Sequence, residues 1–276
     1  MASQAVEDKQ IEATARWTAA VRAQESERTD ALFVDPWAAA LAGAEGTAWL
    51  AQRPPGSGLP MVLRTRYFDD FLQRITAEQG IRQVVLVAAG LDTRAFRLAW
   101  PAQTRIFELD QVAVLAYKSA VLAQAGALAV CARTAIAADL TEPWSARLAA
   151  SGFDAQQPAV WLLEGFLFYV PVHRIVEILD ALTALAAPGS WLGFDIVNSA
   201  VLTSPWTRPW VEMQAQAGAP WIGTLDDPVA FLAARGWTAS LTQAGAPDAH
   251  YGRWTLPVIP TTAPDMPHNW YVTAHR

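Results

Sequence analysis

Three acidic side chains follow short apolar segments of the sequence, where they could bind a hydroxyl-bearing or cationic ligand. Asp110 closes the segment 105–110, Asp139 follows the segment 133–137, and Glu164 follows the segment 159–163. A single acid in such a place is most often a helix cap or a first-turn residue, which the helix dipole favours. Three acids in the same relative position indicate instead one shared binding site.

The segment 84–94, VVLVAAGLDTR, holds the strongest local motif. A continuous apolar run leads into a turn at Gly90, where the missing side chain lets the backbone approach a ligand and adopt a positive φ. Asp110 follows about 20 residues later, the spacing at which an acid contacts the ribose hydroxyls in dinucleotide-binding folds. Glu108 is the alternative acid, and an ordinary turn with a glycine cap is the alternative interpretation of the motif.

The ligand predicted for this turn carries a ribose but no pyrophosphate. A pyrophosphate loop has more glycines than this one, and the carboxylate of Asp92 would repel phosphate. S-adenosyl-L-methionine (SAM) fits better, because it joins an adenosine to a sulfonium, an ammonium and a carboxylate. Asp139 would then accept a hydrogen bond from the adenine amino group, and Leu140 would pack on the ring.

The elements that position these residues alternate between strands and helices. Buried strands are expected at 84–88, 105–108, 133–137, 159–163 and 191–197, with two more at 237–242 and 270–274. Helices are expected at 5–28, 30–52, 61–79, 111–124 and 172–186, with a further start in 94–100. This alternation predicts an α/β fold of the Rossmann-like type with a seven-stranded, mostly parallel sheet.

Two segments outside this alternation are predicted to cover the site. The breaker-rich stretch 53–60 ends an N-terminal helical cap, residues 1–60. The stretch 198–226 is rich in Trp and Pro without a clean period, which indicates a lid inserted after the fifth strand. We expect one domain over residues 1–276, with cap and lid above the carboxyl ends of the strands, where open α/β sheets bind ligands.

Composition excludes several classes of protein. Hydrophobic residues make up 53% of the 276 residues and charged residues 17%, so the chain can bury a large core. A net charge of −6 disfavours nucleic acid as a partner. No apolar run suits a membrane span, and no secretory signal is visible, so a cytoplasmic protein is expected. One cysteine, Cys131, excludes a disulfide framework, and no metal-ligand cluster appears.

The motifs together resemble the leucine carboxyl methyltransferase-like family of class I SAM-dependent methyltransferases. The resemblance includes its bacterial branch, which holds O-methyltransferases and tetracenomycin-type polyketide carboxyl methyltransferases. It runs nearly end to end, and its most specific blocks are GLDTR at 90–94 and FELDQ at 107–111. The other matching blocks lie at 14–15, 22–26, 32–36, 64–70, 139–140, 164–169 and 270–274.

The resemblance implies roles for the matched residues. Arg66 would pair with the SAM carboxylate, and Glu164 would lie near its ammonium group. Arg22, or as the alternative Arg28, would be the basic residue of an N-terminal helix that closes over the site. The remaining cofactor contacts implied are Ala89 and Gly90 at the methionine part, Asp110 at the ribose, and Asp139 and Leu140 at the adenine.

The acceptor decides whether a base is needed. A carboxylate is ionised at neutral pH, whereas a phenol with a pKa near 10 benefits from a base. His250, with Tyr251, is the candidate base. Arg22 and Arg253 are candidates to bind an acceptor carboxylate, and Trp206 and Trp210 to form an aromatic wall for the acceptor.

The function expected from the sequence is methyl transfer from SAM to a small-molecule carboxylate, giving a methyl ester in natural-product metabolism. A phenolic or other hydroxyl O-methyltransferase is the alternative within the same class. An NAD-dependent oxidoreductase on the same sheet, or a protein that binds SAM without turnover, are the alternatives from other classes.

Overall fold

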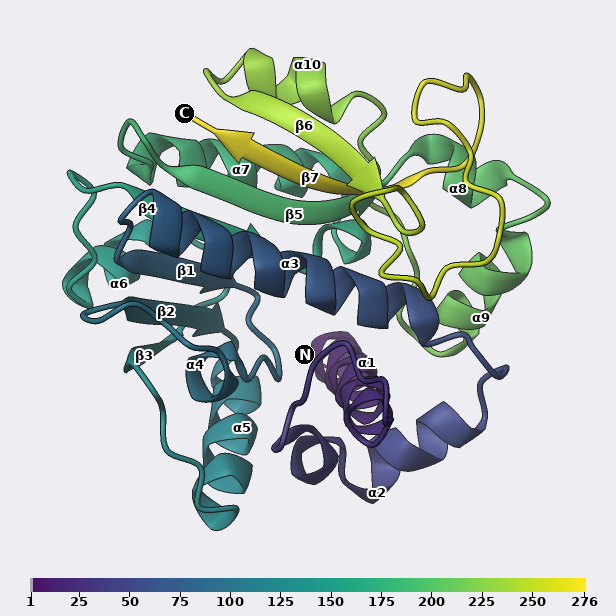
Figure 1. Cartoon of the computed structure of the whole chain (residues 1–276), viewed down its shortest axis with the longest axis horizontal. Coiled ribbons are helices and arrows are strands. Elements are labelled where there is room, and N and C mark those ends of the chain that lie inside the picture. The colour runs from purple at the N-terminus through teal and green to yellow at the C-terminus, as the bar shows by residue number, and fades with distance from the viewer. Residues whose placement is uncertain (1) are drawn as a thin grey trace.

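One seven-stranded sheet forms the centre of the molecule (Figure 1). The computed structural model describes residues 2–276, with side chains from Thr14 onward. The strand order is β3-β2-β1-β4-β5-β7-β6, and only β7 runs antiparallel to its neighbours. The strands are β1 (Gln83–Val87), β2 (Arg105–Asp110), β3 (Ala132–Ala137), β4 (Ala159–Leu163), β5 (Trp191–Val197), β6 (Thr238–Gln243) and β7 (Asn269–His275).

The central strands are apolar throughout because helices cover both of their faces. Every residue of β1 and β4 is buried. On one face, Val84 and Leu86 pack with α3 (Leu59–Glu78), whereas Val85 and Val87 on the other face pack with α7 (Val172–Leu185). Figure 1 shows α3 lying across one face of the sheet and α7 behind it.

The N-terminal cap consists of α1 (Ala2–Ser26) and α2 (Ala38–Ala51), which pack closely against each other. A side chain at Gly46 of α2 would clash with the backbone of Arg16 in α1, since an added Cβ would lie 2.4 Å from the Arg16 carbonyl oxygen. The helix expected over 30–52 is shorter than predicted, because residues 27–37 form turns and irregular backbone. Helix α2 is also kinked at Gly43, where φ is +58°.

The lid, residues 198–226, contains α8 (Ser199–Thr203) and α9 (Arg208–Gln216). Its far end is held to a 3-10 turn, η1 (Leu167–Tyr169), by the amides of Ile222 and Gly223, which both donate to the Phe168 carbonyl at 2.8 and 3.0 Å. The short helices α4 (Arg94–Arg97), α5 (Val112–Gln124), α6 (Ser145–Ala150) and α10 (Pro228–Ala233) complete the fold.

The seven predicted strands are all present, each within two residues of its expected ends. Helices α6, α10 and η1 were not predicted, because each is too short to show a period. Within the described residues, no helix combines the length and apolarity needed to cross a lipid bilayer. The single-domain organisation and the cytoplasmic location remain predictions.

Candidate functional site

A cavity of about 1030 Å³ opens at the carboxyl ends of the parallel strands. Pockets that hold small ligands commonly measure about 300–1,000 Å³, so this one has room for a cofactor together with an acceptor. Turns after β1, β2, β3 and β4 line one end, which we call the cofactor end. The cap, the lid and η1 line the other, which we call the acceptor end.

The turn after β1 and the end of β2 meet at the cofactor end. The Gly90 amide donates to Asp110 Oδ2 at 2.6 Å, and the Gln111 amide donates to Oδ1 at 2.7 Å. Burial raises the pKa of Asp110, although these two amides act in the opposite direction. Gly90 has a φ of +49°, and a Cβ added there would meet no protein atom within 4 Å. Ala88 turns the chain out of β1 with a φ of +54°.

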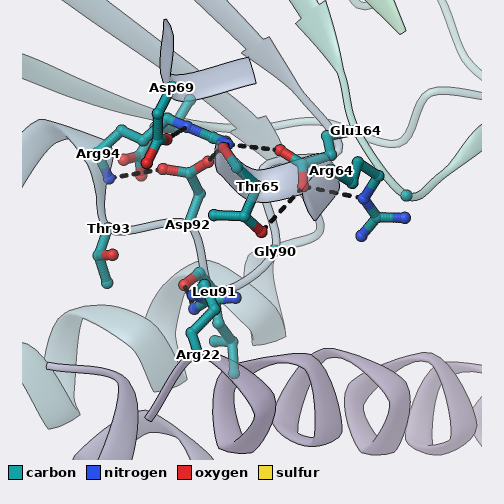
Figure 2. A network of polar contacts seen from close by, with 12 residues as sticks. Arg22, Arg64, Thr65, Asp69, Gly90, Leu91, Asp92, Thr93, Arg94 and Glu164 are labelled. Carbon is teal, nitrogen blue, oxygen red and sulfur yellow. Dashed lines mark hydrogen bonds and ion pairs between the residues drawn. The ribbon is translucent and has the colours of Figure 1, made fainter. Parts of the chain in front are cut away.

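A network of ion pairs centred on Arg94 lies beside this turn (Figure 2). Arg94 pairs with Asp69 at 2.6 Å, with Glu164 at 2.7 Å and also with Asp92. Burial would raise the pKa of Asp92, but the charges of Arg94 and Lys118 hold it at about 2. Burial likewise opposes ionisation of Glu164, whose pKa is nevertheless lowered by the neighbouring arginines. Asp92 and Glu164 therefore stay charged at neutral pH.

Arg64, rather than Arg66, lies at the cavity. Arg64 donates to Glu164 at 3.0 Å and to Asp195 at 2.8 Å, and its side chain lines the cofactor end. Arg66, expected to pair with the SAM carboxylate, lies outside the cavity lining, where it pairs with Asp70 at 2.9 Å. The reason is helical geometry, because residues two apart on a helix point to different sides.

Arg22 joins the cap to the cofactor turn. It donates to Asp35 at 2.9 Å and to the Leu91 carbonyl at 2.7 Å, and it lines the cavity (Figure 2). Thr93 donates to the same Asp35 at 2.6 Å. The alternative, Arg28, instead forms a surface pair with Asp30.

Asp139, Leu140 and Ala89 line the cavity, as do Gly90, Asp110 and Glu164. The Asp139 side chain accepts hydrogen bonds from the amide and hydroxyl of Thr141 at 2.8 and 2.7 Å. The structure thus brings together all the predicted cofactor residues except Arg66. Their contacts with a cofactor remain predictions.

Aromatic rings line the acceptor end. Trp210 lies 6.0 Å from Trp17 and 6.2 Å from Trp221 between ring centroids, joining cap to lid. Phe168 of η1 lies 4.6 Å from Trp221. Trp206 also lines the cavity, but 71% of it is exposed, so it lies at the rim.

The predicted base and one predicted acceptor contact lie elsewhere. His250, Tyr251 and Arg253 are all outside the cavity lining, because residues 250–253 form a surface turn beside the cap. Tyr251 donates to Asp70 at 3.1 Å, and Arg253 donates to Glu25 at 3.0 Å. The structure therefore does not bring these three residues to the cavity.

One histidine that the sequence analysis passed over does line the cavity. His268 is buried, with Nδ1 at 3.2 Å from Gln243 Oε1 and Nε2 at 3.4 Å from the Ala263 carbonyl. Both ring nitrogens therefore face oxygen acceptors. Arg64 and Arg94 were missed as well, although Arg64 precedes Phe68, Phe71 and Ile75 at helical spacing and so shares their sheet-facing side.

The cofactor end fits SAM. At Gly90 the space that a side chain would fill is open toward the cavity. Each oxygen of Asp110 accepts one amide, which leaves further lone pairs for ribose hydroxyls. The amino-acid part of SAM carries an ammonium and a carboxylate, which Glu164 and Arg64 would hold. Asp139 and Leu140, which also line the cavity, would hold the adenine.

Comparisons with known proteins agree with this arrangement. The family model described as leucine carboxyl methyltransferase matches residues 15–183. A candidate SAM-dependent methyltransferase of Streptomyces coelicolor is 40% identical over 260 residues, which cover 90% of each chain. One of Frankia alni is 38% identical over 263 residues, again covering 90% of each.

The fold also matches solved structures. A crystal structure of a candidate methyltransferase from Thermobifida fusca superposes with a TM-score of 0.63 over 95% of this chain and 94% of that one. A crystal structure of a Streptomyces avermitilis protein superposes with a TM-score of 0.57 over 94% of this chain and 96% of that one. Sequence identities of 17% and 15% limit these two likenesses to the fold.

Proposed function

The chain belongs to the leucine carboxyl methyltransferase family, and we propose that it methylates the carboxylate of a small molecule, forming a methyl ester. It is a SAM-dependent methyltransferase, as its relatives are named. The carboxylate acceptor, and a role in natural-product metabolism, are the proposed parts. Membership in this methyltransferase family replaces the alternatives of an NAD-dependent oxidoreductase and of a SAM-binding protein without turnover.

One observation carries the choice of a carboxylate: among the residues described, the carboxylates and the histidine that line the cavity are engaged by partners within the protein. Asp92 and Glu164 are engaged by arginines and stay ionised. Both nitrogens of His268 face oxygens of the protein itself, at 3.2 and 3.4 Å, so neither ring nitrogen points freely at an acceptor. An acceptor that is already ionised at neutral pH suits such a site, because it needs no proton removed.

Bound SAM supplies an electrophilic methyl group on a sulfonium. The residues of the chain then have to hold that group and the acceptor oxygen in line, at about 3–3.5 Å. Asp110 would accept hydrogen bonds from the ribose hydroxyls, and Arg64 with Glu164 would fix the amino-acid part. The tryptophans of cap and lid would orient the acceptor and exclude water from the reacting atoms.

We propose that the Tyr169 hydroxyl contacts the acceptor oxygen. Tyr169 lines the cavity beside Trp221 and Phe168. Burial raises the pKa of Tyr169 to about 12, so the hydroxyl stays neutral and can donate but does not act as a base at neutral pH.

The test is methyl transfer to matched acceptors. The enzyme is incubated with SAM and with pairs of carboxylic acids and phenols of equal size, and products are identified by mass spectrometry. We expect methyl esters, formed at a rate that is flat from about pH 6 to pH 9, since the acceptor is ionised throughout. Methyl ethers alone, formed at a rate that climbs toward pH 10, would overturn the carboxylate and support the phenol.

The variant His268→Gln serves as the matched control, because glutamine keeps a hydrogen-bonding side chain but cannot act as a base. We expect its rate with carboxylic acids to stay within about two-fold of the parent rate. A steep loss near neutral pH that recovers at high pH would show that a base is used after all.

A further inference from the structure

Arg53, two residues after the end of α2, is a half-buried arginine without an ion-pair partner among the described residues. Its Nη2 donates to Gln214 Oε1 at 3.2 Å, whereas Nη1 is buried and has no hydrogen-bond partner. Among the described residues no carboxylate pairs with it. A buried N–H group without an acceptor carries a desolvation cost, which an oxygen of a bound ligand would remove.

Three indole rings surround this guanidinium. Its carbon lies 5.1 Å from the centroid of Trp17, 5.4 Å from Trp49 and 6.0 Å from Trp210. Aromatic faces attract a cation, but they do not replace an anion. Burial among these rings lowers the pKa of Arg53, an effect that the Tyr169 hydroxyl opposes.

The surroundings of Arg53 belong to the acceptor end. Trp17, Trp210 and Gln214 all line the cavity, and so does the next residue, Pro54. Trp17 and Pro54 belong to the cap, whereas Trp210 and Gln214 belong to α9 of the lid. Arg53 therefore lies where the cap meets the lid. Arg53 itself is not among the residues that line the cavity, so its guanidinium would reach a ligand after a side-chain rotation at this junction, a common adjustment on ligand binding.

The arginines that line the cavity differ from Arg53 in this respect. Arg22 pairs with Asp35 at 2.9 Å, Arg64 with Asp195 at 2.8 Å, and Arg97 with Asp69 at 2.6 Å. The protein thus satisfies the charges at the cofactor end with its own carboxylates. Arg53 has no such carboxylate among the described residues.

We propose that Arg53 binds the carboxylate of the acceptor, whose apolar or aromatic body packs between the tryptophans of cap and lid. A guanidinium offers a planar fork that matches a carboxylate with two parallel hydrogen bonds. This inference rests on the proposed function, since it assigns the residue that would recognise the acid.

The test compares acids with their neutral amides. Binding of 1-naphthoate and 1-naphthamide, and of benzoate, cinnamate and decanoate with their amides, is followed by tryptophan fluorescence in protein saturated with S-adenosylhomocysteine. We expect at least one acid to bind the parent protein more tightly than its amide. In Arg53→Gln that acid should lose about 10- to 100-fold in affinity while the amide is unchanged.

Arg53→Lys keeps the charge and should retain part of the preference. Arg235→Gln is the matched control, because Arg235 also stacks on a ring, at 3.6 Å from Phe231, but that ring lies outside the cavity lining, unlike Trp17 and Trp210. Its acid preference should equal that of the parent. A merely structural role of Arg53 would weaken acid and amide alike.

Two results would overturn the proposal: no acid preferred over its amide, or a preference that survives in Arg53→Gln. If that variant does not fold, a crystal structure of the parent protein with the preferred acid decides, since the carboxylate must contact Arg53. Failure of the proposed function can be told apart from failure of the role proposed for Arg53. Arg53-dependent binding without ester formation would refute only the function, whereas full ester formation by Arg53→Gln would refute only the role of Arg53.

Discussion

The two ends of the cavity satisfy their charges in different ways. At the cofactor end, Arg94 alone pairs with three carboxylates, and Arg64 pairs with two. At the acceptor end, Arg53 is surrounded by indole rings and has no carboxylate beside it in the described structure. One end is electrostatically complete before any ligand binds, and the other is not.

This difference matches the two ligands that the enzyme must accept. SAM has the same charges in every turnover, so a network fixed in advance holds the cofactor turn in place without reorganisation. The acceptor presents a large apolar body, and aromatic rings bind such a body with few geometric demands. We therefore expect substitutions at the cofactor end to reduce stability and cofactor affinity, and those at the acceptor end to change acceptor affinity alone.

Arg94→Gln should have the largest effect. It leaves Asp69, Asp92 and Glu164 buried beside one another without their shared cation, and breaking a buried pair in this way costs about 3–5 kcal/mol. Urea denaturation measures the loss. Arg235→Gln, which breaks an exposed pair with Asp180, should cost less than about 1 kcal/mol. Equal losses in the two variants would contradict a special role for the network.

Asp92→Asn should destabilise the protein less, by about 1.5–3 kcal/mol, because Arg94 keeps its other partners. The effect should depend on pH. The folded-state pKa of Asp92 is about 2 against an ordinary 3.8, so its stabilisation is complete above the ordinary value and is lost as pH falls toward 2. The difference in unfolding free energy between variant and parent should be constant from about pH 7 to pH 4 and shrink below that. A difference that faded already near neutrality would contradict the low pKa.

Asp110→Asn should weaken binding of S-adenosylhomocysteine by about 10-fold, because the ribose loses a charged acceptor. Calorimetry gives the dissociation constant. The control Asp154→Asn lies beside Gln83 at the opposite ends of the strands and should leave that constant unchanged. An unaltered affinity in Asp110→Asn would remove Asp110 from the cofactor site.

Trp210→Ala should have the smallest effect of the four and should change only the acceptor. Loss of its contacts with Trp17 and Trp221 is expected to raise the acceptor KM by about 3- to 10-fold, with cofactor affinity unchanged. Trp206→Ala, at the exposed rim, should change KM less than two-fold. A loss of cofactor affinity in Trp210→Ala would blur the division between the two ends.

The fold was predictable because its signals are local. Apolar runs such as 84–87 and 159–163 can be buried on both faces only in the middle of a covered sheet, and the helices between them set the strands parallel. The turns of 27–37 and the short helices α6 and α10 escaped, since their residues carry no period and their shape depends on what they pack against.

The site was predictable where the backbone itself positions a residue. Gly90, Asp110, Asp139 and Glu164 follow strands, and strand ends meet at one edge of the sheet. Side chains that reach the cavity from helices or loops were harder to place. Choosing Arg64 over Arg66 depended on which face of α3 meets the sheet, and excluding His250 depended on the path of a surface turn.

The left-handed backbone at Ala88 limits which sequences this corner of the cofactor turn tolerates. With a φ of +54°, any residue but glycine carries a penalty of about 1–2 kcal/mol, and a β-branched side chain carries more. Glycine, asparagine and aspartate should therefore be accepted at position 88, and valine, isoleucine and threonine rejected, although the cavity beside it has room. Variation here is restricted by the conformation of the main chain and not by the volume of the side chain.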